Sequence, residues 1–168
     1  MPTPSEDLQI VTATSAAEIA AARHLVKEYG ESLGVDLSFQ NFQIELELLP
    51  GEYALPKGAL LLARIGDNYA GCVALRPWAS TVCEMKRLYV RPRWRGRGIG
   101  QRLIDEILNV ARRAGYSAMR LDTLPSMSAA RALYESFGFR PIAPYYDSPV
   151  HGTTFMEFDL IRKATKAL

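Results

Sequence analysis

Apolar residues recur along this chain with two different spacings, which separate the expected strands from the expected helices. Apolar runs of strand length occupy seven segments, at 9–13, 59–65, 69–75, 81–90, 116–123, about 140–146 and 153–160. In the last segment Met156, Phe158 and Leu160 alternate with Glu157 and Asp159, which is typical of a strand with one buried face. Helical spacing marks four further segments, from Ser15 to Gly30, at about 38–49, around Leu103 to Ala111, and from Ser128 to Gly138.

Local signals mark the ends of two of these helices. Ser15 followed by Glu18 matches a capping box, and Gly30 is expected to end the first helix. Gly138 followed by Phe139 matches a left-handed glycine cap with its hydrophobic contact. Both helix boundaries are therefore predicted from a few neighbouring residues.

Turn signals connect the expected strands. Gly66, Asp67 and Asn68 separate two apolar runs and predict an antiparallel hairpin. The sequence RPWAS at 76–80 is expected to form the next turn, and the polar segment 31–36 to form a mobile loop. Strands in succession, followed by alternating strands and helices, predict an α/β fold in which helices cover both faces of one mixed sheet. We expect a single domain over residues 1–168, because no repeat or linker interrupts them.

Composition agrees with a folded protein. Of the 168 residues, 48% are apolar and 23% are charged, as in ordinary globular domains. No apolar run reaches the roughly 18 residues of a membrane span, and the first residues lack the layout of a signal peptide, so we expect a cytoplasmic protein with no membrane partner. Cys72 and Cys83 lie in apolar strand segments, where cysteine usually acts as a small buried side chain. The net charge of +2 does not by itself indicate nucleic-acid binding.

The basic signal is local, in the segment VRPRWRGRGIGQRL at 90–103, which has five arginines and lies between an expected strand and an expected helix. Unpaired N–H groups at the start of a helix attract anions, glycines let a phosphate approach the backbone, and arginines add charge-assisted hydrogen bonds. The sequence therefore predicts a pyrophosphate site. The residues expected to form it are Arg95, Gly96, Arg97, Gly98, Ile99, Gly100, Gln101 and Arg102.

Spacing separates this segment from other phosphate-binding motifs. The dinucleotide fingerprint GxGxxG directly follows its strand, whereas here the glycines read GxGxG and Gln101 takes the third place. Asp122, at the end of the next strand, is one feature in favour of that alternative, since a ribose-binding acid would lie there. The phosphate loop GxxxxGK[ST] is absent from the sequence.

The segment RGRGIG at 95–100 fits the Q/RxxGxG/A signature of the GNAT superfamily of acetyl-CoA-dependent N-acetyltransferases, which this chain resembles from about 59 to 140. The preceding EMKRLYV and the later ALYESFGFR resemble the strand and the second cofactor segment of that superfamily. The resemblance implies a mostly antiparallel sheet of about six or seven strands, acetyl-CoA as the acyl donor, and an amine as the acceptor.

The same resemblance implies roles for residues near the cofactor. Leu88, Tyr89 and Val90 would pair with the pantetheine arm along a strand that diverges from its neighbour, and the Val90 N–H would bind the thioester oxygen. Tyr134 matches the tyrosine that protonates the departing thiolate, although it could equally be a core aromatic. Met127 stands where many members carry an asparagine that contacts the pantetheine arm.

Glu84 matches a position at which several members carry a carboxylate that removes the proton of the amine. Such a group is needed because only about one alkylamine in 10³ to 10⁴ is neutral at pH 7. The alternative is an ordinary ion pair of Glu84 with Lys86 or Arg87.

Two loops are expected to border the acceptor site in this fold. One covers about 30–38, and the other carries Tyr145, Tyr146, Asp147 and His151, in which Asp147 could pair with an ammonium ion beside an aromatic wall. We expect no metal site, because neither His24 nor His151 lies near other ligand-type residues in the sequence.

The main hypothesis is an N-acetyltransferase that acts on a small-molecule or peptide amine and does not bind nucleic acid; the superfamily also implies a homodimer. One alternative is a nucleic-acid-binding module that uses the 86–97 stretch. Its contacts would be Lys86, Arg87, Arg91, Arg93, Arg95 and Arg97, with Trp94 stacked on a base. A second alternative is an acyl-CoA sensor without catalysis.

Overall fold

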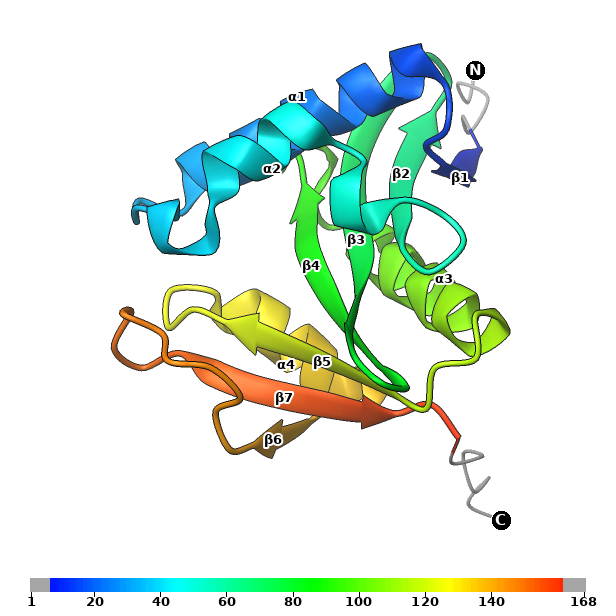
Figure 1. The fold of residues 1–168 in the computed structure, drawn as a ribbon. Helices are drawn as coiled ribbons and strands as arrows, with labels where there is room; N and C mark the ends of the chain where they lie inside the picture. Colours follow the sequence, from blue (N-terminus) through cyan, green and yellow to red (C-terminus); the bar gives the residue numbers. More distant parts are fainter. Residues whose placement is uncertain (1–6, 162–168) are drawn as a thin grey trace.

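One seven-stranded sheet with helices on both faces forms the computed structural model, which describes residues 7–161 (Figure 1). The elements in chain order are β1 (Leu8–Thr12), α1 (Ala16–Ser32), η1 (Ser38–Gln40), α2 (Phe42–Leu48), η2 (Gly51–Tyr53), β2 (Ala59–Ile65), β3 (Asn68–Ala79), β4 (Val82–Val90), η3 (Pro92–Trp94), α3 (Ile99–Arg113), β5 (Ala118–Thr123), α4 (Ser128–Phe137), β6 (Arg140–Ile142) and β7 (Thr154–Asp159). The predicted α/β class and mostly antiparallel sheet are confirmed.

The strands lie in the order β1-β2-β3-β4-β5-β7-β6, and only β4 and β5 run parallel. This parallel pair is short. It begins at Val82 opposite Ala118 and ends at Glu84 opposite Arg120. Beyond Glu84, β4 continues to Val90 without pairing to β5, so the sheet opens at the divergence that the resemblance implies (Figure 1).

A β-bulge interrupts β4 in this open part. Cys72 of β3 lies opposite Tyr89, but Ala74 lies opposite Lys86, so two residues of β4 face one residue of β3. The first of the two, Arg87, has a φ of 62°, in the left-handed region that non-glycine residues rarely adopt. The bulge shifts the side-chain alternation of β4 by one position.

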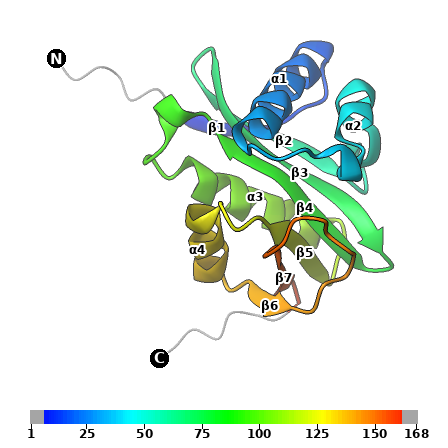
Figure 2. The ribbon, with the colours of Figure 1, turned by 90° about the vertical axis from the view of Figure 1, so that its left-hand side faces the viewer.

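Two helical layers cover the sheet, α1 and α2 on one face and α3 and α4 on the other (Figure 2). Alternate residues of β2 serve the two layers: Leu60 and Leu62 pack in the cluster that contains α1, whereas Leu61 and Ala63 pack in the cluster that contains α3. This period of two is the one that a strand buried on both faces requires.

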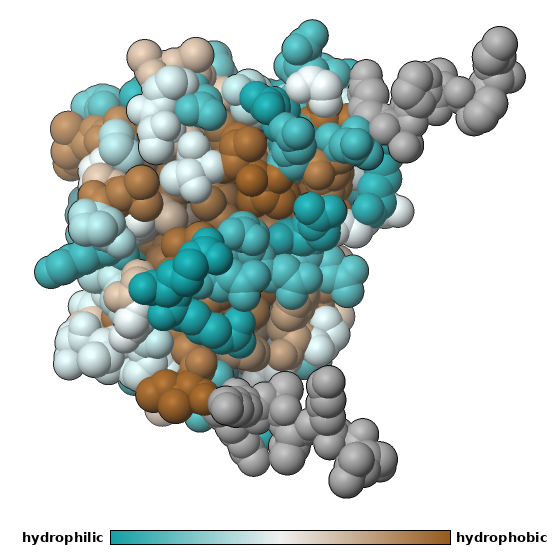
Figure 3. Space-filling model, turned by 90° about the vertical axis from the view of Figure 1, so that its right-hand side faces the viewer, coloured by the Kyte–Doolittle hydropathy of each residue, from teal (hydrophilic) through white to brown (hydrophobic). Residues whose placement is uncertain are grey.

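The apolar stripe predicted for α3 is confirmed. Its apolar stripe is fully buried, with Leu103, Ile104, Ile107, Leu108 and Ala111 at 3% exposure or less. Its opposite side is hydrophilic, and hydrophilic side chains gather in a band across the face that lies at the right of Figure 1 (Figure 3). The helix is therefore held by one face against the sheet.

The predicted helix caps are confirmed. The Ser15 hydroxyl accepts the Glu18 N–H at 3.1 Å, and Glu18 Oε1 accepts the Ser15 N–H at 3.0 Å. At the other cap, Gly138 has a φ of 108°, and the Phe139 N–H donates to the Tyr134 carbonyl at 3.1 Å. The Phe139 ring then packs edge-on against the Tyr134 ring, which fixes the start of β6 beside α4.

The prediction that Gly30 ends the first helix is wrong. Helix α1 continues to Ser32. A side chain at Gly30 would lie 2.6 Å from the Phe42 ring, so the glycine lets α2 pack closely against α1. A glycine in a helix can serve packing as well as termination, and sequence alone does not separate the two uses.

Three other boundaries differ from expectation. The RPWAS segment continues β3 to Ala79 with an irregular register near Pro77, so the turn comes later. The expected helix at 38–49 is divided at Asn41, whose φ is 55°. Strand β6 spans only Arg140–Ile142, and the rest of the expected strand belongs to the loop before β7.

Candidate functional site

A groove of about 610 Å³ runs between the end of β4, the start of α3 and helix α4. Nine of the residues expected to bind the cofactor line it: Leu88, Tyr89, Val90, Arg95, Gly96, Gly98, Ile99, Gly100 and Gln101. Arg97 and Arg102, which were also expected there, are exposed side chains outside the lining. The structure thus gathers most of the predicted residues in one place.

The start of α3 has the chemistry of an anion site. Gly98 is the N-cap residue with a φ of 76°, and no side chain caps the free N–H groups of the first turn. Gly96 also has a positive φ, of 79°, and a Cβ added to it would meet no heavy atom within 4 Å. Open space in front of free amides at the positive end of a helix fits the diphosphate of a coenzyme.

Among the arginines of this segment, Arg95 lines the groove. Its Nε donates to the Val90 carbonyl at 2.9 Å, and its guanidinium lies 5.9 Å from the centre of the Tyr89 ring. Arg95 therefore joins the loop before α3 to the last residues of β4, and its remaining N–H groups are placed beside the anion site.

The alternative interpretation as a nucleic-acid binder required an accessible Trp94 and free cations. Trp94 is 7% exposed, and the guanidinium groups of Arg93 and Arg97 each lie 4.8 Å from its ring centre. Lys86 and Arg87 are 7% and 4% exposed. Three of the contacts assigned to nucleic acid are thus buried, and this part of the alternative is wrong.

The end of β4 presents backbone groups to the open side of the sheet. The Arg91 N–H donates to the Ala70 carbonyl of β3 at 2.8 Å. Because peptide directions alternate along a strand, the N–H groups of Leu88 and Val90 lie on the opposite edge, where β4 has no partner strand. These groups are placed to pair with an extended ligand in the groove.

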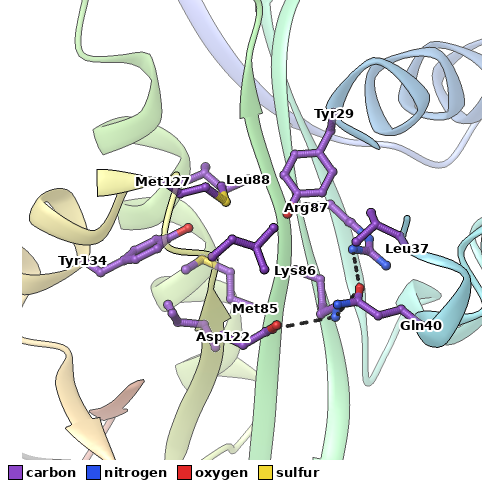
Figure 4. Close-up of a pocket in the computed structure, with 12 residues that line it drawn as sticks. Tyr29, Leu37, Gln40, Met85, Lys86, Arg87, Leu88, Asp122, Met127 and Tyr134 are labelled. Atoms are coloured by element: carbon purple, nitrogen blue, oxygen red, sulfur yellow. Dashed lines mark hydrogen bonds and ion pairs between the residues drawn. The ribbon is translucent and has the colours of Figure 1, made fainter. Parts of the chain in front are cut away.

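A second, much smaller cavity of about 20 Å³ adjoins the groove (Figure 4). Tyr29, Leu88 and Met127 line both. The small cavity is further lined by Tyr134 from α4 and by charged side chains of β4 and β5. It has room for about one water molecule, so only a small chemical group fits there.

Tyr134 lies beside this cavity and is 5% exposed. Its ring packs against Phe139, and within residues 7–161 no group forms a hydrogen bond with its hydroxyl. Burial raises the pKa of Tyr134 well above its ordinary value, so the phenol stays protonated. The side chain can donate a proton to a group bound at the junction of the cavity and the groove.

Glu84 lies elsewhere. Its side chain is 1% exposed, and it lines neither the groove nor the small cavity. Arg76 Nε donates to Glu84 Oε1 at 2.8 Å, and the Tyr145 hydroxyl donates to Oε2 at 2.6 Å. The ion pair is thus with Arg76 rather than with the neighbouring Lys86 or Arg87.

The carboxylate that does line the small cavity is Asp122, at the end of β5. Its Oδ2 accepts the Tyr146 hydroxyl at 2.6 Å, and its Oδ1 lies 3.9 Å from Lys86 Nζ. Figure 4 shows Asp122 and Lys86 pointing toward one another from β5 and β4. Two unlike charges therefore meet where the strands diverge.

A second buried ion pair lies beside the first. Arg87 donates to both carboxylate oxygens of Glu45 from α2, at 2.8 and 3.0 Å, and to the Gln40 amide oxygen at 2.8 Å. The Arg87 guanidinium also lies over the Phe42 and Tyr29 rings. These contacts hold the bulge of β4 against α2.

The two loops expected to border the acceptor meet the site only in part. Leu37 and Gln40 reach the small cavity, while Tyr145 and Tyr146 turn inward to Glu84 and Asp122. Asp147, His151 and His24 are exposed and line neither the groove nor the small cavity. Tyr145 and Tyr146 pack edge-on against each other, but neither lines the groove or the small cavity. The structure therefore supports neither the aromatic wall nor the contact of Asp147 to an ammonium ion.

Sequence reasoning missed several lining residues. The groove also contacts Tyr29, Ser32, Leu33, Ser126, Met127, Ala129, Ala130 and Leu133, and the small cavity contacts Lys86 and Asp122. Most of the groove residues are small or apolar and carry no chemical signal. Lys86 and Asp122 did carry one, since both are charges in apolar strand segments.

Other candidate chemistry is weak. Cys72 and Cys83 are free and buried, as predicted, and burial raises the pKa of each thiol to about 12. Within residues 7–161 no group of three or more potential metal ligands comes together. No helix in the same range is long and apolar enough to cross a membrane.

Comparisons with known proteins agree with this geometry. The sequence model described as Acetyltransferase (GNAT) family matches residues 20–139. An uncharacterized N-acetyltransferase of Schizosaccharomyces pombe is 44% identical over 81% of this chain and 85% of its own length.

Two solved structures show the same fold. A GNAT-family acetyltransferase from Staphylococcus aureus has a TM-score of 0.76 at 18% identity, over 92% of this chain and 99% of that one. An N-acetyltransferase from Thermoplasma acidophilum, in complex with coenzyme A, has a TM-score of 0.68 at 18% identity, over 91% and 99% of the two chains.

Proposed function

The chain belongs to the GNAT family of acetyltransferases, and we propose that it transfers the acetyl group of acetyl-CoA to a primary amine of a small molecule or peptide by direct attack while both substrates are bound. As a member of this family it is an acyltransferase that uses acetyl-CoA. When bound, acetyl-CoA supplies a reactive thioester.

One observation carries the proposal: the groove with free amides at one end adjoins, at its other end, the small cavity that contains Tyr134. A ligand anchored by its phosphates at Gly96 and Gly98 can extend along Leu88 to Val90 toward that cavity. The open edge of β4 supports pairing with the pantetheine arm. The acceptor then approaches from the side of the charged residues, so both substrates can be present together.

Val90 and Tyr134 act on two different atoms at which negative charge develops during the transfer, the carbonyl oxygen and the sulfur. The Val90 N–H binds the carbonyl oxygen of the thioester and stabilises negative charge there. The Tyr134 hydroxyl donates its proton to the departing sulfur. Its position beside the small cavity and its lack of a hydrogen-bond partner within residues 7–161 support this role, and its raised pKa keeps the proton on the hydroxyl until the sulfur departs.

The base is proposed to be Glu84, acting through Tyr145. Because Glu84 lines neither cavity, it cannot contact an amine in the small cavity directly. Tyr145, whose hydroxyl donates to Glu84 at 2.6 Å, lines neither cavity either, so the relay includes a water molecule that carries the proton of the amine to the Tyr145 hydroxyl as this hydroxyl passes its own proton to Glu84. In this proposal Glu84 is the final acceptor of the proton and does not contact the amine.

Glu84→Gln is expected to slow acetylation most at low pH. There few amines are neutral, so the reaction depends most on an enzymic base. The measurement is kcat/KM between pH 6 and 9 for the variant and the unmodified enzyme. Glu157→Gln serves as the control, because it also removes an ion pair with an arginine, Arg120 at 2.7 Å, but at a half-buried position outside both cavities. A pH profile of Glu84→Gln parallel to that of the unmodified enzyme would leave Glu84 as the structural partner of Arg76.

The direct test of the function is thiol release from acetyl-CoA, measured across amino acids, polyamines, aminoglycosides and peptide N-termini. We expect turnover with at least one class of amine. Binding of acetyl-CoA without turnover on any of them would instead favour an acyl-CoA sensor. The proposal also includes a cytoplasmic location and a homodimer, which cell fractionation and light scattering can test.

A further inference from the structure

Of the charged residues that line the small cavity, Lys86 has the hydrogen bonds and ion pairs that offset its burial least. Its side chain is 5% exposed, and it lines the cavity together with Asp122 and Tyr134 (Figure 4). A buried ammonium group is costly unless hydrogen bonds and an opposite charge offset the loss of water. The contacts of Lys86 offset this cost less than the contacts of Glu84 and Arg87 offset theirs.

Those contacts are few and long. Gln40 Oε1 lies 3.2 Å from Lys86 Nζ, but the same oxygen accepts a shorter bond from Arg87, at 2.8 Å. Asp122 Oδ1 is 3.9 Å away, beyond hydrogen-bond distance. A lysine has three N–H donors, so two have no acceptor within residues 7–161. By contrast, Glu84 and Arg87 both hold close charged partners, at 2.8 Å.

The electrostatic surroundings also disfavour the charged form of Lys86. Burial, together with the positive charge of Arg87, lowers the pKa of Lys86 below its ordinary value. The site would be relieved by an anion that brings oxygen atoms to the free donors. An acceptor amine that binds in this cavity supplies such an anion only if it carries an acidic group of its own.

Charge balance decides which acidic group fits. Asp122 already contributes one negative charge beside Lys86, and Arg87 is paired with Glu45, so an ammonium compound that carried a doubly charged phosphate would leave one uncompensated negative charge in the cavity. A carboxylate with an ammonium group near it adds one charge of each sign and leaves the total unchanged. The small volume, about 20 Å³, admits only a small group, so a planar carboxylate fits better than a tetrahedral phosphate, and the rest of the acceptor would lie at the mouth of the cavity toward the groove.

We propose that the acceptor is an amine with a carboxylate close to it, as in a free amino acid, and that Lys86 binds the carboxylate while Asp122 faces the ammonium group. This proposal rests on the acetyltransferase function proposed above and narrows its substrate class. Polyamines and aminoglycosides bring only positive charge toward Lys86 and Arg87. Peptide N-termini bring an uncharged amide carbonyl in place of the carboxylate.

The first experiment needs no variant. kcat/KM for thiol release is measured with the twenty amino acids, and then with the carboxamide and the decarboxylated amine of the best of them. We expect the free amino acid to exceed both by roughly 10- to 100-fold, because a hydrogen bond to a charged partner contributes that much to affinity. Faster turnover with polyamines, dipeptides or the carboxamide would overturn the proposal while leaving the acetyltransferase function in place.

The second experiment replaces the lysine. Lys86→Met keeps a long side chain without charge, and an apolar residue is often well tolerated in place of a buried ion. We expect kcat/KM for the amino acid to fall roughly 10- to 100-fold, with little change for the carboxamide and with unchanged acetyl-CoA affinity by calorimetry. Lys57→Met, at an exposed position, is the control.

Each outcome of these experiments has one meaning. An equal loss for the amino acid and the carboxamide would overturn the role of Lys86 in binding the carboxylate. If Lys86→Met does not fold, the comparison on the unmodified enzyme decides. No turnover with any amine, despite acetyl-CoA binding, would overturn the proposed function and this substrate class with it.

Discussion

Gly98→Val should weaken acetyl-CoA binding by roughly 10²- to 10⁴-fold, the effect of losing two hydrogen bonds to a charged group. Gly98 caps α3 with a φ of 76°, and a Cβ there would meet only Gln101 Oε1, at 3.9 Å. The valine side chain would therefore have no close contact at its Cβ. It would instead occupy the space in front of the free amides and force the backbone out of the conformation that aims them at the groove. Isothermal calorimetry measures the change.

The control for this variant is Gly115→Val, at the other end of α3. Gly115 also has a positive φ, of 89°, and open space around its missing side chain, but it lies outside the groove. The two variants share the backbone strain and differ in position relative to the proposed diphosphate. Equal losses of acetyl-CoA affinity in both would show that strain is the cause, and unchanged affinity in Gly98→Val would refute the phosphate site.

Tyr134→Phe should lower kcat on the order of 10²-fold, the usual contribution of a general acid, with no change in acetyl-CoA affinity. The substitution removes only the hydroxyl, which has no hydrogen-bond partner within residues 7–161, and it keeps the ring contact with Phe139. The melting temperature should therefore stay the same. Steady-state kinetics and calorimetry separate the effect on turnover from the effect on binding.

Tyr116→Phe is the matched control for loss of a tyrosine hydroxyl. The Tyr116 hydroxyl donates to the Lys57 carbonyl at 2.6 Å, outside the groove and the small cavity. Its removal should cost some stability and leave kcat unchanged. If Tyr134→Phe retained the kcat of the unmodified enzyme, another group would have to protonate the sulfur.

Features decided by neighbouring residues could be predicted from the sequence. The capping box at Ser15, the cap at Gly138 and the apolar stripe of α3 depend on residues within one or two turns, and the structure has all three. The glycine-rich segment at 95–100 belongs to the same class, since a strand, a turn and a helix start follow directly in the chain.

Features decided by distant residues could not be predicted. Gly30 packs against Phe42 from another helix, so its helix did not end where the local signal indicated. Glu84 was expected near a substrate, but Arg76 and Tyr145 from other strands and loops enclose it. These are contacts of tertiary structure, which override local preference.

The pair of Lys86 and Asp122 is the clearest case of this kind. The two residues are separated along the chain by a whole helix, and they meet because β4 and β5 are parallel neighbours. Asp122 had been noted only as a ribose-binding acid for a different fold. The sequence offered one signal, a charged residue in each of two apolar strands. That the two charges are partners became clear only from the order of the strands in the sheet.

The bulge at Arg87 bears on how enzymes of this design can diversify. Before it, Glu84 and Lys86 face the layer of α1 and α2; after it, Leu88 and Val90 face the opposite layer. The same strand therefore carries two separate sets of side chains. Substitutions before the bulge can change the residues that face α1 and α2 without altering Leu88 and Val90. Deleting Leu88 or Tyr89 would reverse the alternation after the bulge and turn Val90 to the wrong side, so evolution in this part of the strand is expected to proceed by substitution rather than by changes in length.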